Sequence, residues 1–207
     1  MKKRELLKQH KKLIIAAALL AVVTMGSTVA YLADQTGFLI NRFEQAPSKI
    51  ETEIKEETEG RKEPWVVNVG ETTALIRMRV TVTPMNESEY PTEAQLLTEL
   101  GASWSENWKR GDDGFWYWQG ALEAGSDSKT DSLFLLPLQD GSGAANEKLL
   151  AYLKENPNFD ITLYHEACPT YAIIDGQRIN AVKGGVYNQE RAEQIWAYYS
   201  KDANPSR

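Results

Sequence analysis

The sequence predicts a mostly β protein, an antiparallel β-sandwich with two or three short helical insertions. The clearest observation is LIRMRVTVT, residues 75–83, in which apolar residues alternate with arginine and threonine until Pro84 ends the run. FDITLYHEA, residues 159–167, alternates in the same way. Short alternating runs, separated by turns and a few helical stretches, are typical of a β-sandwich.

An edge strand is predicted near the start of this sandwich. In IETEIKE, residues 50–56, Ile50, Thr52 and Ile54 alternate with charged residues, so that one face meets solvent. A helix is the alternative, because glutamate and lysine favour helices, but no apolar stripe at helical spacing supports it. Residues 56–63 are then expected to form a solvated turn or loop.

Two further strands and three helices complete the prediction. WVVNVG at 65–70 and SLFLLPL at 132–138 are expected to be strands. Helices are expected at three places: after the capping-box pair Thr92 and Gln95, over residues 147–155, and over residues 188–200, where Ile195, Trp196 and Tyr199 are available for docking.

The arginines of the strand at 75–83 have two interpretations. Arg77 and Arg79 could bind a carboxylate together, or they could be solvated or paired across the sheet. Arginines on the outer face of a strand are more often solvated or paired across the sheet than used to bind a carboxylate.

An aromatic segment, SWSENWKRGDDGFWYWQGAL at 103–122, holds four of the six tryptophans. Asp113-Gly114 predicts a hairpin turn within it. Exposed aromatic rings beside acids can bind a sugar or a partner surface, whereas a place in the core is the alternative. The candidate interaction surface consists of Trp104, Trp108, Trp116 and Trp118.

The first 30 residues are predicted to be a signal peptide. Six lysine or arginine residues precede the apolar run 13–25, and small residues follow it. Cleavage is expected between Ala30 and Tyr31. The alternative is a retained anchor, because residues 13–33 carry no charge and are long enough to span a bilayer.

Charge and length limit the partners and the domain organisation. Residues 31–207 hold 17 basic and 28 acidic residues, a net charge of -11, so nucleic acid is not expected as a partner. The expected organisation is a signal peptide at 1–30, an N-terminal segment with the edge strand at 31–64, and the remainder of a single β-sandwich domain at 65–207.

No catalytic or metal site is predicted. His165-Glu166 has the form of the start of a zinc-protease motif, but Pro169 stands where the second histidine would share the helix face. Cys168 is the only cysteine, so no internal disulfide is expected. It is expected to be a small buried residue, with an intermolecular disulfide as the alternative. No cofactor and no enzymatic activity are expected.

Motifs along the chain carry a family resemblance. AYLAD at 30–34, NRF at 41–43 and the strand at 50–56 follow a small-residue cut in the order AYF-x-D, N-x-F and alternating strand. VVNVGETTALIRMRV at 66–80, DDGFWYWQGALEAGSDSKTDSLF at 112–134 and FDITLYHEACPTY at 159–171 continue the pattern. Together they resemble the exported TasA/camelysin family of Gram-positive bacteria. Relative to that family, residues 170–187 look inserted.

The resemblance implies a jelly-roll-like sandwich that a SipW-type signal peptidase releases to the cell surface or the biofilm matrix. The implied partners are this peptidase, further copies of the chain, or other matrix and pilus proteins, with membrane contact only before cleavage. The protein is therefore expected to be a secreted structural protein, a fibre subunit or accessory. Assembly would proceed by strand addition through Ile50, Thr52 and Ile54. The alternatives are a monomeric secreted carbohydrate- or pilus-binding module and, less favoured, a camelysin-like metalloprotease.

Overall fold

The described part of the chain is mostly β and antiparallel, as the sequence predicts. The structure is a computed structural model, and it describes residues 50–57, 60–125, 127–139 and 145–202. The chain divides into two units, residues 1–37 and 38–207, and all described residues belong to the second.

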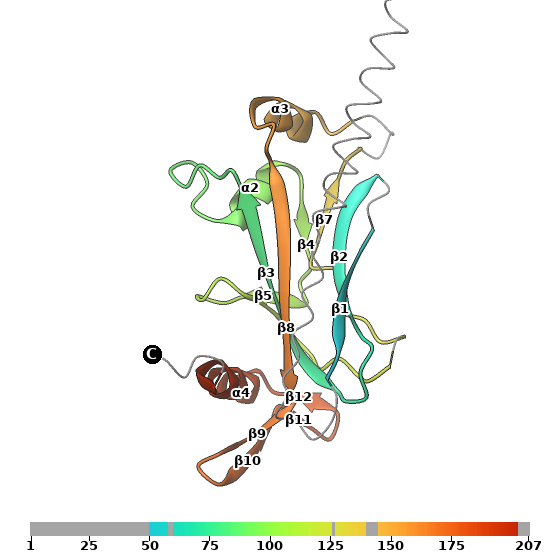
Figure 1. The fold of residues 1–207 in the computed structure, drawn as a ribbon, viewed down its shortest axis with the longest axis vertical. Coiled ribbons are helices and arrows are strands. Elements are labelled where there is room, and N and C mark those ends of the chain that lie inside the picture. Colours follow the sequence, from blue (N-terminus) through green and yellow to red (C-terminus); the bar gives the residue numbers. More distant parts are fainter. Residues whose placement is uncertain (1–49, 58–59, 126, 140–144, 203–207) are drawn as a thin grey trace, which may run out of the picture. The chain divides into compact units, whose positions relative to one another are not determined.

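Two four-stranded sheets dominate this unit (Figure 1). The first has the order β1 (Thr52–Glu57), β2 (Arg61–Asn68), β7 (Phe134–Pro137) and β4 (Ser103–Trp104). The second has the order β5 (Trp108–Arg110), β6 (Trp116–Trp118), β3 (Ala74–Thr83) and β8 (Asp160–Pro169). The other described elements are the hairpins β9 (Tyr171–Ile174) with β10 (Gln177–Asn180) and β11 (Val182–Lys183) with β12 (Val186–Tyr187), and the helices α2 (Glu93–Glu99), α3 (Glu147–Glu155) and α4 (Gln189–Asp202).

The pair β3 and β8 is the longest in the fold, and the two strands run side by side in Figure 1. Ten residues of each strand are paired, from Ala74 opposite Pro169 to Thr83 opposite Asp160. The alternation read from the sequence places one face of both strands in the core, so both strand predictions are confirmed.

The main core lies between the two sheets. Both sheets contribute buried apolar side chains, and helices α2 and α3 add leucines to the same cluster. Its fully buried large members include Val66, Ile76, Met78, Leu96, Leu97, Phe134, Leu136, Leu149 and Ile161. Two antiparallel sheets packed on one core form the predicted β-sandwich. The jelly-roll connectivity implied by the resemblance stays a prediction.

The three helices lie within one or two residues of their predicted ranges, and α2 begins at its predicted capping box. Thr92 accepts a hydrogen bond from the backbone of Gln95, and the Gln95 side chain closes the capping box on α2. Asn146 caps α3 by accepting from the backbone of Leu149 at 3.2 Å. Gly101, with φ of 98°, takes the left-handed conformation just after α2.

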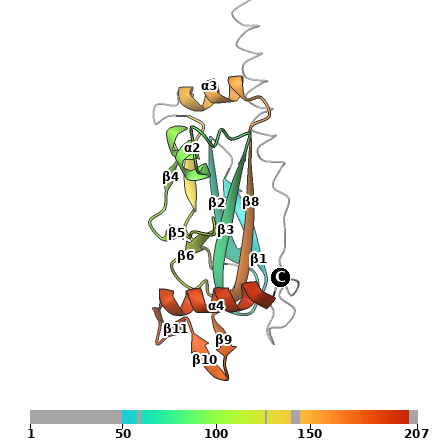
Figure 2. The same cartoon turned by 90° about the vertical axis from the view of Figure 1, so that its left-hand side faces the viewer.

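A second, smaller core lies on the outer face of the second sheet. It joins Leu75 and Cys168 of the paired long strands to Ile195 and Trp196 of α4, with Ala172 of β9 also buried there. Figure 2 shows α4 crossing this sheet near β9 and β10. Residues 170–187, which look inserted in the sequence, form the two hairpins that line this core.

The prediction of a solvated turn or loop at residues 56–63 is wrong for most of these residues. β2 already begins at Arg61, and its Lys62 faces inward with only 3% of the side chain exposed. The Lys62 ammonium forms an ion pair of 2.9 Å with Glu56 of β1, so two charged residues that suggest a loop neutralise one another inside the hairpin. The predicted boundary between residues 64 and 65 falls inside β2.

Candidate functional site

The four tryptophans of the expected interaction surface do not form an exposed surface. Trp108 and Trp116 are 3% and 8% exposed, and both belong to the main core. Trp104 stacks on Trp116 with ring centroids 4.2 Å apart, while Trp118 packs against Trp108 at 5.5 Å. This prediction is corrected because tryptophans from three short strands meet between the sheets and cover one another.

The opposite face of the aromatic hairpin is covered as well. The Arg77 guanidinium lies 4.0 Å from the ring centre of Phe115 and 4.5 Å from that of Trp196 in α4. Its Nε donates to Glu166 at 2.6 Å, directly across the β3–β8 pair. Arg77 is thus paired across the sheet, as one of the two interpretations predicts, while Arg79 remains exposed.

A short hydrogen-bond chain continues from this arginine. Arg77 donates to the Tyr117 hydroxyl at 3.0 Å, and Tyr117 donates to Asp113 at 2.6 Å. Burial and the hydrogen bond to Asp113 raise the pKa of Tyr117 to about 12, against the opposing effect of Arg77. Asp113 also accepts from the backbone of Phe115, so it serves the predicted hairpin turn.

The three residues of the expected assembly strand lie inside their own sandwich. Ile50 and Thr52 are 4% and 2% exposed, and Ile54 is partly buried against the main core. β1 pairs with β2 at six positions, and among the described strands it forms the edge of the first sheet. The side chains expected to fill pockets of a neighbouring copy therefore already fill pockets within this chain.

His165 connects β1 to the other sheet. Thr52 Oγ1 and His165 Nε2 are hydrogen-bonded at 2.9 Å, and Nε2 lies 3.2 Å from the Thr52 carbonyl oxygen. Burial lowers the pKa of His165, while the bond to the Thr52 carbonyl acts in the opposite direction. The histidine that begins a zinc-like motif in the sequence is thus a core residue on a strand.

Cys168 is fully buried, and burial raises the pKa of its thiol well above the usual value. The expectation of a small buried residue is confirmed. Across residues 50–57, 60–125, 127–139 and 145–202, no group of three or more histidine, cysteine, aspartate or glutamate side chains is placed to hold a metal ion.

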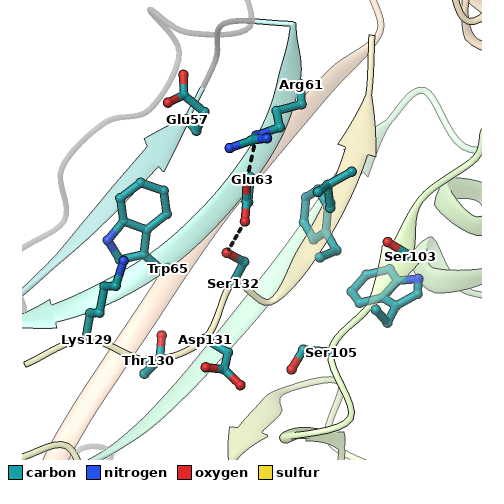
Figure 3. A pocket seen from close by; sticks show the side chains of 13 residues that line it. Glu57, Arg61, Glu63, Trp65, Ser103, Ser105, Lys129, Thr130, Asp131 and Ser132 are labelled. Carbon is teal, nitrogen blue, oxygen red and sulfur yellow. Dashed lines mark hydrogen bonds and ion pairs between the residues drawn. The ribbon is translucent and has the colours of Figure 1, made fainter. Parts of the chain in front are cut away.

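The most promising ligand site is a groove of about 510 Å³ beside the first sheet (Figure 3). β2 forms one side of this groove, β4 and the start of β7 form the other, and the segment 129–132 runs between them. The residues that line the groove are Glu57, Arg61, Glu63, Trp65, Ser103, Trp104, Ser105, Lys129, Thr130, Asp131, Ser132, Phe134 and Leu135.

Polar side chains in the groove are held in place by neighbours. Glu63 forms an ion pair of 2.7 Å with Arg61 and accepts a hydrogen bond of 2.7 Å from Ser132. Both interactions are drawn in Figure 3. Asp131 accepts a hydrogen bond of 2.6 Å from Asn107. The two carboxylates are therefore oriented by protein donors while they line an open groove.

Trp65 supplies the aromatic wall of the groove. Alternation along β2 directs its half-buried indole to the outer face, while Pro64 and Val66 face inward. The Lys129 ammonium lies 5.5 Å from the centre of its ring. Of the interaction residues predicted from the sequence, Trp104 lines this groove. Sequence reasoning does not identify Trp65 or the segment 129–132 as part of a site, because the lining comes from segments far apart in the chain. A tryptophan on the solvent-facing side of a strand is the one signal that could have indicated it.

The predicted cleavage residues Ala30 and Tyr31 lie outside the described residues. Among the helices within the described ranges, none has both the length and the apolar character that crossing a bilayer requires. Comparison of the chain with protein-family models, with curated proteins and with solved structures gives no match.

Proposed function

We propose that this chain is an exported structural protein of the cell surface or biofilm matrix, a fibre subunit or an accessory to fibres. The basic, apolar and small-residue succession of residues 1–30 supports export. The motifs that resemble the TasA/camelysin family support release by a SipW-type signal peptidase. The antiparallel β-sandwich is the fold class that this resemblance implies.

The observation that carries the proposal is the position of β1. It is the first described strand after the predicted signal peptide and its short following segment, and among the described strands it has a neighbour on one side only. Ile50, which precedes β1, and Thr52 at its start are buried, and the hydrogen-bond partner of Thr52, His165, belongs to the other sheet. A strand at a sheet edge with specific pockets is suited to exchange between identical copies.

The burial of Ile50 and Thr52 gives the proposed assembly a specific form. β1 of one copy replaces β1 of the next, so the contacts to β2 and His165 become intermolecular without a new interface. A head-to-tail exchange that does not close on itself grows a filament. Before cleavage the leader holds β1 near the membrane, which makes processing the step that permits assembly.

Export and assembly are tested by expressing the chain with and without a SipW-type peptidase. We expect a secreted product that begins at Tyr31 and forms filaments in negative-stain micrographs. A product with that N-terminus that stays monomeric would favour the binding-module alternative. An uncleaved, membrane-bound chain would contradict export.

Strand exchange is tested by locking β1 to β2. Glu53 and Val67 are opposite one another in the antiparallel pair, so the double variant Glu53→Cys/Val67→Cys should form a disulfide within the monomer. The oxidised chain should not assemble, and reduction should restore filaments. The single variant Glu53→Cys is the control, and equal filament growth from the locked chain would rule out exchange of β1.

Proteolysis, the third function that the resemblance raises, has a separate test. A camelysin-like activity would cleave casein and would lose this activity in a chelator. The proposal of a structural protein predicts no cleavage above that of a mock preparation from the same host.

A further inference from the structure

The groove beside the first sheet has the size and the mixed lining of a ligand site. Its volume of about 510 Å³ lies within the range of roughly 300–1,000 Å³ typical of small-molecule pockets. Figure 3 shows Trp65, Glu63, Ser132 and Asp131 distributed along it. These residues lie on β2 and on the segment 129–132, which runs antiparallel beside β2 through the Val67–Lys129 bridge.

Trp65 offers the apolar contact that a sugar ring needs. The faces of a pyranose ring carry C–H groups, and a large flat indole can cover them at little cost in conformational entropy. Pairing of β2 with β1 fixes the backbone of Trp65 opposite Lys55. Lys129 is exposed, so its side chain can move from the ring when a ligand enters.

The polar groups of the groove match the hydroxyl groups of such a ring. Ionised carboxylates accept hydrogen bonds, and serine hydroxyls both donate and accept. Glu63 and Asp131 are already oriented by Arg61, Ser132 and Asn107. Because these contacts exist before binding, less conformational entropy is lost when a hydroxyl-bearing ligand docks.

The charged residues that line the groove limit the class of sugar that can bind there. The groove lining contains three acids, Glu57, Glu63 and Asp131, against two bases, Arg61 and Lys129. A polyuronic acid would bring further carboxylates to this acidic lining, which like-charge repulsion disfavours. Neutral sugars avoid this repulsion, and amino sugars bring an ammonium group that the acids attract.

We propose that this groove binds a polysaccharide segment of neutral or amino-sugar pyranoses, with Trp65 stacking on a ring and Glu63 and Asp131 accepting hydrogen bonds from its hydroxyl or amino groups. The site goes beyond the proposed role as a structural protein. It would let each subunit hold the sugar polymer that surrounds it. Of the strand proposed to exchange, β1, the groove lining includes only Glu57, and the residues proposed to contact the sugar lie on β2 and on the segment 129–132.

The test titrates the oxidised Glu53→Cys/Val67→Cys chain, which is expected to stay monomeric and in which neither substituted residue lines the groove, with three hexasaccharides and follows backbone amide shifts by NMR. The probes are cellohexaose, which is neutral, a glucosamine hexamer, which is cationic, and a galacturonate hexamer, which is acidic. We expect the first or second to bind with a Kd on the order of 0.1–1 mM and to shift residues of the groove. No binding by any probe, or tightest binding by the galacturonate hexamer, would overturn the proposal.

Variants connect binding to the groove. Trp65→Ala should weaken binding at least about tenfold, as removal of an aromatic anchor usually does. Tyr198→Ala removes an exposed aromatic of α4 and is the matched control, with no expected change. Trp65→Phe keeps a ring and should retain most of the affinity. If Trp65→Ala does not fold, the affinity of Trp65→Phe and the positions of the amide shifts on the structure test the site instead. Unchanged binding in Trp65→Ala, or shifts confined to another surface, would refute the site.

Discussion

Arg77 is the residue on which the outer face of the second sheet depends. It contacts Phe115 of the hairpin, Glu166 of β8, and both Trp196 and Ser200 of α4. Arg77→Ala would leave Glu166 without its cation in a largely buried position. We expect a loss of about 3 kcal/mol in the free energy of unfolding, measured by urea denaturation.

The neighbouring Arg79 is the natural control for this experiment. It lies on the same face of β3, but it is exposed, and its guanidinium donates to the Asp113 carbonyl. Arg79→Ala should cost no more than about 1 kcal/mol. Similar losses in the two variants would show that burial and the Glu166 pair do not distinguish the two arginines.

The sequence alone could not separate these arginines. Both occupy the same face of one alternating strand, so periodicity assigns them the same environment. The difference arises because α4, which begins at Gln189, covers the end of β3 that carries Leu75 and Arg77 and leaves the rest of that face exposed. Long-range packing of this kind leaves no trace in the local pattern.

His165 should make stability depend on pH in a defined direction. Because burial lowers its pKa in the folded chain, the unfolded chain binds the proton more readily below its own pKa of about 6.5. Stability is therefore complete above that pH. It falls as the pH is lowered toward the folded pKa, by at most about 1.4 kcal/mol per pH unit.

The measurement is urea denaturation between about pH 7.5 and 5.5, above the ordinary pKa range of carboxylates. The control is His165→Gln, which keeps a donor for Thr52 but does not titrate. Its unfolding free energy should be flatter over this range. An equal slope in both proteins would assign the pH dependence to other groups.

At the scale of elements, the two capped helices give a paired prediction. Thr92→Ala removes the capping box of α2 and should cost about 1 kcal/mol. Asn146→Ala should cost more, because its amide also donates to the carbonyls of Leu100 and Pro137, both at 2.9 Å. Thermal unfolding of both variants checks the order, and a larger effect at Thr92 would contradict this account.

Elements could be predicted where local chemistry determines them. The alternation of β3 and β8, the capping box of α2 and the range of α3 are contained within short windows of sequence, and these elements are found where they are expected. The turn at 56–63 is the exception, because only the pairing of β1 with β2 brings Glu56 and Lys62 together. The groove has the same origin, since three separate segments meet to form it.

At the scale of the whole molecule, the two hydrophobic clusters should open separately. The main cluster joins both sheets, whereas the smaller one depends on α4 and the hairpins. Cys168 belongs to the smaller cluster and is fully buried. We expect its thiol to resist iodoacetamide in the native protein and to react when α4 detaches.

Ile195→Ala tests this arrangement. It removes a fully buried side chain of α4, and it should cost about 2–5 kcal/mol in the stability of the smaller cluster. Mass spectrometry should then detect alkylation of Cys168 at denaturant concentrations at which the amides of β3 are still protected from exchange. Simultaneous loss of both signals would show that the molecule has one cooperative unit.

The β3–β8 pair also has a consequence for the order of folding. Its two strands are separated along the chain by α2, by β4 to β7 and by α3, so the pair requires the closure of a long loop. During synthesis the second sheet stays incomplete until Pro169 has emerged from the ribosome. Most of the chain must therefore wait without its longest strand partner, and under the proposed export this delay leaves time for the unfolded polypeptide to pass through a translocation channel.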